Sequence, residues 1–310
     1  KTYNITVNPP PASITGTATV CAGSVTVLSD ATSGGTWSTS NAGVVTTLAG
    51  STTSGSADGT GAAASFYRPF GVAVDGSGNL YVSDTSNHMI RKITSAGAVT
   101  TLAGSTTPGS ADGTGVTTSF NLPVAVAVDG SGNLYVADMN NNMIRKITSA
   151  GVVTTLAGST TSGHADGTGV AASFLNPAGV AVDGSGNVYV ADTYNHMIRK
   201  ITSAGVVTTL AGSTTSGSAN GTSVAASFNN PNGVAVDGSG NVYVADTINK
   251  MIRKITSAGV VTTLAGSITG GYADGTGAAA SFNYPNGVAV DGSGSLYVAD
   301  TDNEMIRKIV

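Results

Sequence analysis

The sequence predicts an all-β protein, a β-propeller of four-stranded blades built on a 54-residue repeat. Three observations support this prediction. The segment from Gly71 to Gly104 recurs along the chain, and Asp75 and Asp129 mark the 54-residue step between its first two copies. Each copy holds four short apolar, β-branched runs separated by turn residues. No segment shows a sustained helical period, and four strands plus one long connection per repeat are typical of a propeller blade.

The four strands of the first copy can be assigned in order. Residues 71–74 (GVAV) and 79–82 (NLYV) should form an antiparallel pair, because the Asp-Gly-Ser-Gly between them is typical of a hairpin connection. Residues 89–93 (MIRKI) and 98–102 (AVTTL) follow as strands three and four, each after a turn signal. The crossover to the next copy, residues 105–123, is rich in Gly, Ser and Thr.

These motifs resemble the bacterial form of the NHL repeat. The resemblance lies in P-x-G-V-A-V-D at residues 231–237, G-N-V-Y-V-A-D at 240–246 and N-x-M-I-R-K-I at 249–255. It covers residues 44–310 with five copies and implies a propeller. Because one fold hosts many activities, the function must be argued from a site.

Residues 1–43 differ in character from the repeats. The segments Thr19–Ser24 (TVCAGS) and Gly34–Ser38 (GGTWS) resemble the opening strands of Ig-like modules in bacterial surface proteins. The fragment is too short to bury the core of an Ig sandwich by itself. We therefore expect two parts, an Ig-like-resembling segment at 1–43 and NHL-type propeller repeats at 44–310.

The spacing permits two ring layouts. In the favoured layout residues 17–50 form a degenerate first blade and Lys1–Asn8 adds a fourth strand to the last blade, which gives six blades. In the alternative, Val44–Leu48 pairs with residues 287–310, which closes five blades and leaves 1–43 as an appendage. Either closure removes an open sheet edge.

Composition limits the class of partner. The chain has 43 glycines, 10% charged residues and a net charge of −4. Nearly every Lys and Arg belongs to the repeated Arg-Lys pair of strand three, so we expect no nucleic-acid partner. No run of about 18 apolar residues is present, so we expect no membrane span. The single cysteine, Cys21, cannot form an intramolecular disulfide and is interpreted as a buried, inert thiol.

The copies differ from one another mainly at two positions, before strand one and between strands two and three. Both positions lie at the same end of a blade, because strand two returns antiparallel to strand one, whereas the Asp-Gly-Ser-Gly and Thr-Ser-Ala-Gly turns at the other end scarcely vary. We interpret the varied end as a recognition face, because binding residues concentrate on loops held by a rigid scaffold. The predicted ligand-binding residues are Tyr67, Arg68, Phe70, His88, Asn142, Tyr194, His196, Lys250, Tyr284, Asp302 and Glu304.

Other interpretations compete with this one. Neutral drift at exposed tips would give the same variation between the repeats.

The loop that holds Asp75, Ser77 and Asn79 presents oxygen atoms at alternating positions, which could suggest a calcium site. No bidentate acidic ligand follows as in an EF-hand loop, and the chemistry of a hairpin turn accounts for the same residues. The crossover aspartates, Asp58 in the first copy, are likewise assigned to turn chemistry. We expect neither a metal nor a cofactor.

Several repeated residues are assigned to structure. Asp84 and its equivalents should bind either the basic residues of the next strand, Arg91 and Lys92, or turn amides. The Phe66 and Tyr81 series should pack between blades.

The sequence thus favours a non-catalytic binding or scaffold propeller of a secreted or cell-surface bacterial protein, which recognises a partner protein or a glycan. We expect a monomeric ring or a module of a larger chain. One alternative is an enzyme, similar to propeller lactonases or lyases that hold a metal over the channel. Such chemistry needs unlike ligands gathered in one place, whereas the blades are nearly identical and the chain has three histidines. The other alternative is a purely structural spacer.

Overall fold

The computed structural model describes residues 14–15, 29–30 and 47–310. The chain separates into two compact units, Lys1–Thr46 and Thr47–Val310. In the first unit, β1 (Ile14–Thr15) pairs antiparallel with β2 (Ser29–Asp30). The Ig-like resemblance at residues 19–38, the thiol of Cys21 and the proposed closing strand at 1–8 lie mostly or wholly outside the described residues.

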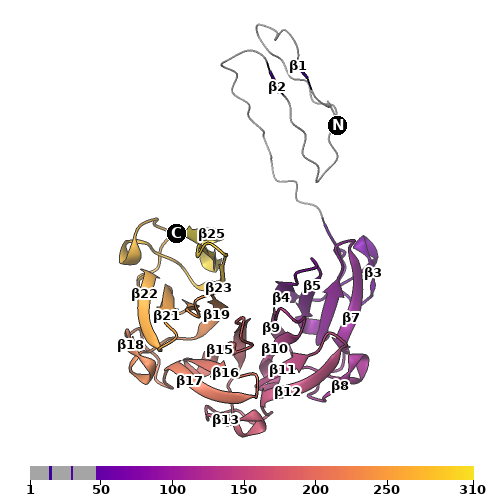
Figure 1. The fold of residues 1–310 in the computed structure, drawn as a ribbon, viewed down its shortest axis with the longest axis horizontal. Helices are drawn as coiled ribbons and strands as arrows, with labels where there is room; N and C mark the ends of the chain where they lie inside the picture. The colour runs from indigo at the N-terminus through magenta and orange to yellow at the C-terminus, as the bar shows by residue number, and fades with distance from the viewer. Residues whose placement is uncertain (1–13, 16–28, 31–46) are drawn as a thin grey trace. The chain divides into compact units, whose positions relative to one another are not determined.

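The second unit consists of five antiparallel sheets, which we call blades 1 to 5 (Figure 1). In each blade the strands follow one another in chain order from the central channel outward. The strands are β4 (Pro69–Val74), β5 (Leu80–Asp84), β6 (Met89–Ile93) and β7 (Ala98–Gly104) in blade 1; β9 (Pro123–Val128), β10 (Leu134–Asp138), β11 (Met143–Ile147) and β12 (Val152–Gly158) in blade 2; β14 (Pro177–Val182), β15 (Val188–Asp192), β16 (Met197–Ile201) and β17 (Val206–Gly212) in blade 3; β19 (Pro231–Val236), β20 (Val242–Asp246), β21 (Met251–Ile255) and β22 (Val260–Gly266) in blade 4; and β23 (Pro285–Val290), β24 (Leu296–Asp300) and β25 (Met305–Ile309) in blade 5.

The crossovers add a short strand that the sequence did not predict. In blades 1 to 4 this two-residue strand pairs with the outer strand of the blade that follows it in the chain, so the sheet gains a fifth member. These strands are β3 (Gly59–Thr60), β8 (Gly113–Thr114), β13 (Gly167–Thr168) and β18 (Gly221–Thr222).

Single turns of 3-10 helix occupy two places in the repeat. One turn precedes each blade, and one joins strands two and three in blades 1, 2, 3 and 5. The first set is η1 (Gly61–Ala63), η3 (Gly115–Thr117), η5 (Gly169–Ala171), η7 (Ser223–Ala225) and η8 (Gly277–Ala279), and the second is η2 (Thr85–Asn87), η4 (Met139–Asn141), η6 (Thr193–Asn195) and η9 (Thr301–Asn303). None of the helical turns among the described residues is long enough to cross a bilayer.

The predicted strand pairing is confirmed residue by residue. Tyr135 lies between Ala127 of strand one and Lys146 of strand three, and this register recurs in all five blades. The hairpin between the first two strands is held by the aspartate at its start. In blade 2 Asp129 Oδ1 accepts the backbone N–H of Ser131 at 2.9 Å, which fixes the turn.

The core lies between blades. One buried cluster joins Tyr81 and Ile90 of blade 1 to Phe120, Leu134 and Ile147 of blade 2, and equivalent clusters join the later pairs. Phe120 and its equivalents in blades 3 and 4 are fully buried. The Phe and Tyr series therefore pack between blades, as the sequence predicted, except for Phe66 and Tyr297 at the two ends of the open ring.

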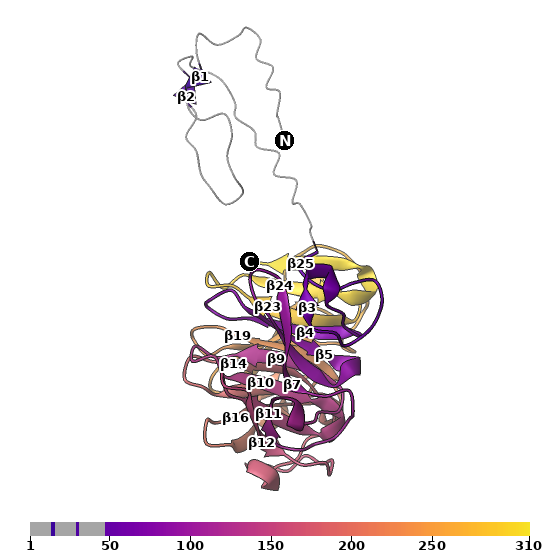
Figure 2. The same cartoon turned by 90° about the vertical axis from the view of Figure 1, so that its right-hand side faces the viewer.

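The expectation of six blades is wrong for the described residues, which form five. The two described segments of the first unit pair only with each other and contribute no strand to a blade. The ring is open between blade 1 and blade 5, where the indigo and yellow ends of Figure 1 face each other. Val72 is 62% exposed where its equivalent Val126 is 7%, and Ile306 is 75% exposed where Ile252 is fully buried. Seen from the side, loops emerge on two opposite sides of the strands (Figure 2).

Candidate recognition face

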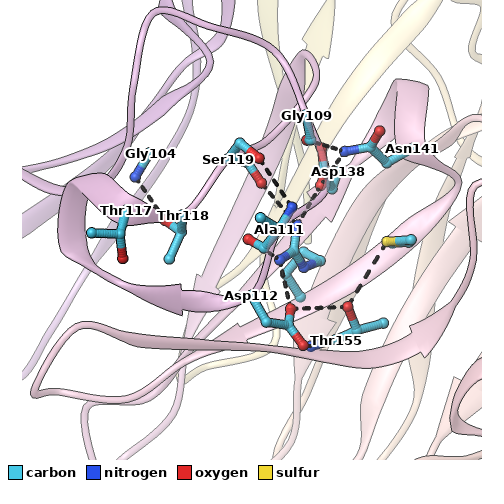
Figure 3. A network of polar contacts seen from close by, with 12 residues as sticks. Gly104, Gly109, Ala111, Asp112, Thr117, Thr118, Ser119, Asp138, Asn141 and Thr155 are labelled. Atoms are coloured by element: carbon cyan, nitrogen blue, oxygen red, sulfur yellow. Dashed lines mark hydrogen bonds and ion pairs between the residues drawn. The ribbon is translucent and has the colours of Figure 1, made fainter.

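A buried aspartate at the end of strand two organises each blade tip. In blade 2 the Asp138 carboxylate accepts hydrogen bonds from the backbone N–H of Asn121 at 2.7 Å, from Asn141 Nδ2 at 2.8 Å and from Arg145 Nη1 at 2.9 Å. Figure 3 shows the bond between Asp138 and Asn141. These bonds tie the loop before strand one to the turn after strand two. Burial nevertheless raises the pKa of Asp138 to about 6. The same set recurs at Asp84, Asp192, Asp246 and Asp300, as expected for a structural role.

The arginine of strand three carries a second ion pair that the sequence analysis missed. Arg145 Nη2 lies 2.6 Å from Asp112 Oδ1 and 3.0 Å from the carbonyl oxygen of Ala111, and its guanidinium lies over the Phe120 ring at 5.2 Å. Asp112 belongs to the crossover series that was assigned to turn chemistry, which is incorrect. The sequence held one indication of this role, because the fourth copy has Asn220 in place of the aspartate. The Oδ1 of Asn220 also accepts a hydrogen bond from the arginine of its blade, Arg253.

The residue after the turn between strands two and three contacts the next blade. His88 has a left-handed backbone (φ 58°), and its Nδ1 accepts the backbone N–H of Leu122 in blade 2 at 3.0 Å. His196 makes the same contact with blade 4, and Asn142 makes it through Oδ1. Three residues predicted to bind a ligand therefore act at blade junctions.

The protonation of these histidines follows from the geometry. An Nδ1 that accepts an amide proton must carry a lone pair, so the imidazole is neutral with its proton on Nε2. Desolvation by burial lowers the pKa of His88 and of His196, which favours the same form.

At the fourth junction the contact is of another kind. Lys250 cannot accept a hydrogen bond, and its Nζ lies over the Tyr284 ring at 5.5 Å and donates to the carbonyl oxygen of Ile268 at 3.4 Å. The structure thus brings two of the predicted residues, Lys250 and Tyr284, together through a cation–π contact.

The mouth of the central channel lies on the varied face. A groove of about 250 Å³ is bounded there by Phe70, Val124, Ala178, Asn232 and Asn286, one residue from each blade. Phe70 is one of the predicted ligand-binding residues. The other four were not among them, although they occupy the same variable position before strand one that the sequence analysis assigned to the recognition face. Below the mouth the channel is lined by valine and alanine.

The remaining predicted residues are dispersed around the face. The side chains of Tyr67 and Tyr194 are exposed on blades 1 and 3. The opening of the ring lies between blade 5, which carries Asp302 and Glu304, and blade 1, which carries Arg68.

The invariant loops on the opposite side hold their carboxylates in protein hydrogen bonds. Asp75 accepts from the amides of Ser77 and Asn79 and from the Tyr81 hydroxyl at 3.0 Å. The side-chain hydrogen bond from Asn79 is the largest cause that lowers the pKa of Asp75 to about 2. Among the residues that the structure describes, no three His, Cys, Asp or Glu side chains are grouped as metal ligands would be.

The repeats and the sheets define the class of this protein, which is a β-propeller that carries NHL repeats. The NHL repeat family matches residues 66–93, 174–201 and 282–308, and the Teneurin NHL domain family matches residues 215–270.

Similar proteins include Protein SUPPRESSOR OF QUENCHING 1, chloroplastic, of Arabidopsis thaliana, which is 30% identical over 81% of this chain and 26% of that protein. NHL repeat-containing protein 2 of Homo sapiens is 35% identical over 39% of this chain and 18% of that protein. The chain therefore spans only 26% and 18% of the length of these two curated relatives. Because the relatives are plant and animal proteins, the repeat motifs do not by themselves indicate a bacterial source.

Similar solved structures share the fold. An auxiliary nutrient binding protein from Bacteroides ovatus matches with a TM-score of 0.60 at 20% identity over 78% of this chain and 58% of that chain. A protein of the same description from Bacteroides thetaiotaomicron gives 0.56 at 18% identity over 86% and 75%. A gluconolactonase from Xanthomonas campestris gives 0.53 at 16% identity over 79% and 76%. At these identities the likeness concerns the fold alone.

Proposed function

We propose that the chain is a non-catalytic recognition propeller whose varied loop face binds a partner protein or a glycan. The observation that carries this proposal is the groove at the channel mouth, to which the five blades contribute four kinds of side chain, with asparagine from both blade 4 and blade 5. Phe70 and Val124 offer apolar contact, and Asn232 and Asn286 offer donors and acceptors, which is the mixture that small polar ligands and side chains require. The relatives of similar fold described as nutrient binding proteins are consistent with such a role.

The geometry of the titratable groups supports a binding role over a catalytic one. His88 and His196 lie at separate junctions with blade 2 between them, and each uses Nδ1 to accept a backbone amide proton. The buried aspartates are each tied to an arginine within their own blade. A general acid or a metal ligand would need one of these groups free and aimed at the channel.

The setting is part of the proposal. A secreted or cell-surface bacterial protein is suggested by the Ig-like resemblance of residues 19–38, and the repeats would serve as a monomeric ring or as one module of a larger chain. The competing spacer role predicts a face without affinity for any ligand.

A matched pair of surface variants tests the proposal on a glycan array and on candidate protein ligands. Phe70 is 68% exposed on the varied face, and Val170 is 71% exposed on a crossover turn whose Gly169 donates to Gly205 at the opposite side. Phe70→Ser should weaken binding at least ~10-fold, which corresponds to the ~1.4 kcal/mol of one well-packed apolar contact. Val170→Ser should leave binding unchanged. Equal effects of the two changes, or no binding by the parent chain, would favour the spacer role.

A further inference from the structure

The crossover that leads into blade 5 departs from the other crossovers at three positions. The others have threonine at the place of Ile268, serine or proline at that of Gly270, and serine or histidine at that of Tyr272. Ile268 is 63% exposed and Tyr272 is 71% exposed. This crossover therefore presents large apolar side chains where the others have mostly small polar residues.

Two of these changes contact the junction between blades 4 and 5. Lys250 Nζ donates to the carbonyl oxygen of Ile268 at 3.4 Å and lies over the Tyr284 ring at 5.5 Å. A Cβ added at Gly270 would lie 3.1 Å from Lys250 Cδ and 3.2 Å from Lys250 Cε. A serine or proline at this position would crowd the lysine, so Gly270 leaves the space that the Lys250 side chain occupies.

Substitutions that contact one another argue against neutral drift at exposed tips. Independent changes would be scattered among the blades, whereas Lys250, Gly270 and Tyr284 differ from the other copies and meet at one junction. The three other closed junctions keep the threonine of the crossover, and two of them use a histidine as the acceptor. Of the four closed junctions, the one between blades 4 and 5 therefore differs most from the rest.

The altered residues form a surface that we call the blade 5 rim patch. It consists of Lys250, Ile268, Tyr272, Asn283 and Tyr284. Asn283 belongs to it because its Oδ1 lies 3.3 Å from the Cβ position of Gly270, which also contacts Lys250. Asn286 of the mouth groove follows Tyr284 by two residues, so the patch continues that groove outward.

Tyr272 lies at the outer edge of the patch. It follows Gly271, whose backbone N–H donates to the carbonyl oxygen of Phe282 at 3.2 Å. Phe282 is the residue before Asn283. The exposed Tyr272 side chain thus belongs to the same part of the varied face as Asn283.

The patch carries a cation and no anion. Lys250 forms no ion pair among the described residues, and its ammonium group keeps two N–H donors beyond the bond to Ile268. It is the one lysine of residues 47–310 outside strand three. The Asn283 amide adds further donors. These groups suit a ligand that is rich in acceptors and carries a negative charge.

The kinds of side chain favour a saccharide over an acidic peptide. The apolar C–H face of a pyranose ring packs on an aromatic ring, and the exposed Tyr272 and Tyr284 both offer one. Sugar hydroxyls match the tyrosine hydroxyls and the Asn283 amide. Recognition of acidic peptide motifs commonly uses a cluster of arginines, whereas this patch has a single lysine.

We infer that the blade 5 rim patch binds a carboxylate-bearing sugar, a uronic acid residue of an acidic glycan, with Lys250 as the partner of the carboxylate. This inference rests on the proposed function of the varied face and names the class of ligand. The Tyr284 ring and the Ile268 carbonyl hold the ammonium group in place before the ligand arrives, which lowers the entropy lost on binding. The glycan continues from the patch toward Asn286 at the channel mouth.

One carboxylate on the same blade tip opposes such a ligand. The backbone N–H of Asp302 donates to the carbonyl oxygen of Asn283 at 3.1 Å, and Asp302 is exposed. Its negative charge lowers the affinity of the patch for an anion. Removal of this charge should therefore increase binding, an effect that loss of folding cannot imitate.

Titration calorimetry of the full chain with matched oligosaccharides tests the inference. The probes are oligomers of glucuronate, galacturonate and mannuronate, each paired with the carboxyl-reduced neutral oligomer of the same length, and an oligoglutamate peptide is the alternative acidic probe. The parent chain should bind at least one uronate oligomer ~10-fold or more tightly than its neutral counterpart, because the charge-assisted hydrogen bond is lost with the carboxylate.

A matched pair of lysine variants locates the carboxylate. Lys250→Met keeps the apolar stem and removes the cation, so the preferred uronate oligomer should bind at least ~10-fold less tightly. Lys200→Met is the control, because Lys200 Nζ also lies over a tyrosine ring, that of Tyr189 at 5.7 Å, but belongs to strand three of blade 3. It should leave binding unchanged. Thermal melting of both variants verifies that they are folded.

Two further variants test the charge and the aromatic surface separately. Asp302→Asn should strengthen binding of the uronate oligomer about 2-fold at low salt and leave the neutral oligomer unaffected. Ile268→Thr with Tyr272→Ser restores residues of the other crossovers and should weaken binding of the uronate oligomer and of its neutral counterpart alike.

Several results would overturn the inference. Equal affinity for a uronate oligomer and its neutral counterpart, or unchanged binding by a folded Lys250→Met chain, would show that Lys250 does not pair with a carboxylate. Binding of oligoglutamate without any uronate oligomer would assign the patch to a protein partner. If Lys250→Met loses its fold, Asp302→Asn decides, and an affinity for the uronate oligomer that does not increase counts against the inference.

Phe70→Ser separates these failures from failure of the proposed function. Binding of any other ligand that depends on Phe70 but not on Lys250 would leave the proposed function standing and refute the rim patch. Absence of any ligand of the parent chain, among glycans and candidate proteins, would overturn both.

Discussion

His88 Nδ1 accepts the backbone N–H of Leu122 at 3.0 Å, although the two residues belong to different blades. The residue after the turn between strands two and three therefore joins one blade to the next. The side chains that this position tolerates are limited by the need to make that contact. Residues that vary on an exposed loop were expected to serve recognition. At three of the five tips they serve the junction instead.

The junction contact predicts which substitutions His88 tolerates. His88→Asn should be nearly neutral, because Asn142 makes the equivalent contact through Oδ1 and asparagine accepts a left-handed backbone. His88→Val should lower the free energy of unfolding by about 1–3 kcal/mol, since it loses the acceptor and places a β-branched residue at positive φ. Urea denaturation of both variants checks the difference. Equal stability of the two would show that the contact contributes nothing.

The two aspartates that bind Arg145 should differ sharply in importance. Asp112 is half-exposed and has a natural amide equivalent in Asn220, so Asp112→Asn should cost less than about 1 kcal/mol. Asp138→Ala should cost about 3–5 kcal/mol, because it leaves the fully buried Arg145 without its buried partner. Hydrogen exchange at the amides of blade 2 is the suitable measurement, because a repeat protein can open one blade at a time. An equal loss for the two variants would contradict this ranking.

Gly158 should not accept a side chain. Its φ is 91°, and a Cβ would meet the carbonyl oxygen of Asn142 and lie 2.9 Å from the Phe174 ring. Gly158→Ala should therefore lower stability by more than ~1 kcal/mol. Gly184→Ala is the matched control, because nothing lies within 4 Å of its Cβ and its φ is not positive. Thermal melting of the two variants should separate them clearly, and similar melting temperatures would disprove the steric argument.

Stability should pass through a maximum in mild acid. Burial raises the pKa of Asp138 and Asp246 to about 6, so the folded state binds more protons there and stability rises as the pH falls from about 6 to about 4. Hydrogen bonds from Asn79 and Ser293 are the largest causes that lower the pKa of Asp75 and Asp291, each to about 2. These two carboxylates contribute stability above about 4 that is lost as the pH falls toward 2.

Urea unfolding at pH 7.5, 4.5 and 2.5 checks this profile. The midpoint should be higher at pH 4.5 than at pH 7.5 and should fall again between pH 4.5 and pH 2.5. A midpoint that keeps increasing down to pH 2.5 would show that the hairpin carboxylates are not held in their charged form.

The sequence alone determined the repeat, the four strands of a blade and the inter-blade packing of the Phe66 and Tyr81 series. This was possible because strand formation depends on local alternation and turn residues, and because a 54-residue period repeated five times leaves one arrangement of those strands. Hairpin geometry also predicted that Asp84 binds Arg91, Lys92 or turn amides, and the structure shows that the basic partner is Arg91.

Tertiary structure decided the rest. The pairing of β8 with β12 and of Asp112 with Arg145 joins residues far apart in the chain, and a two-residue strand carries no alternation to predict it. The junction role of His88 depends on where Leu122 of the next blade lies. The number of blades depends on the angle at which one blade packs on the next, and identical repeats specify each junction without specifying how many junctions a ring contains.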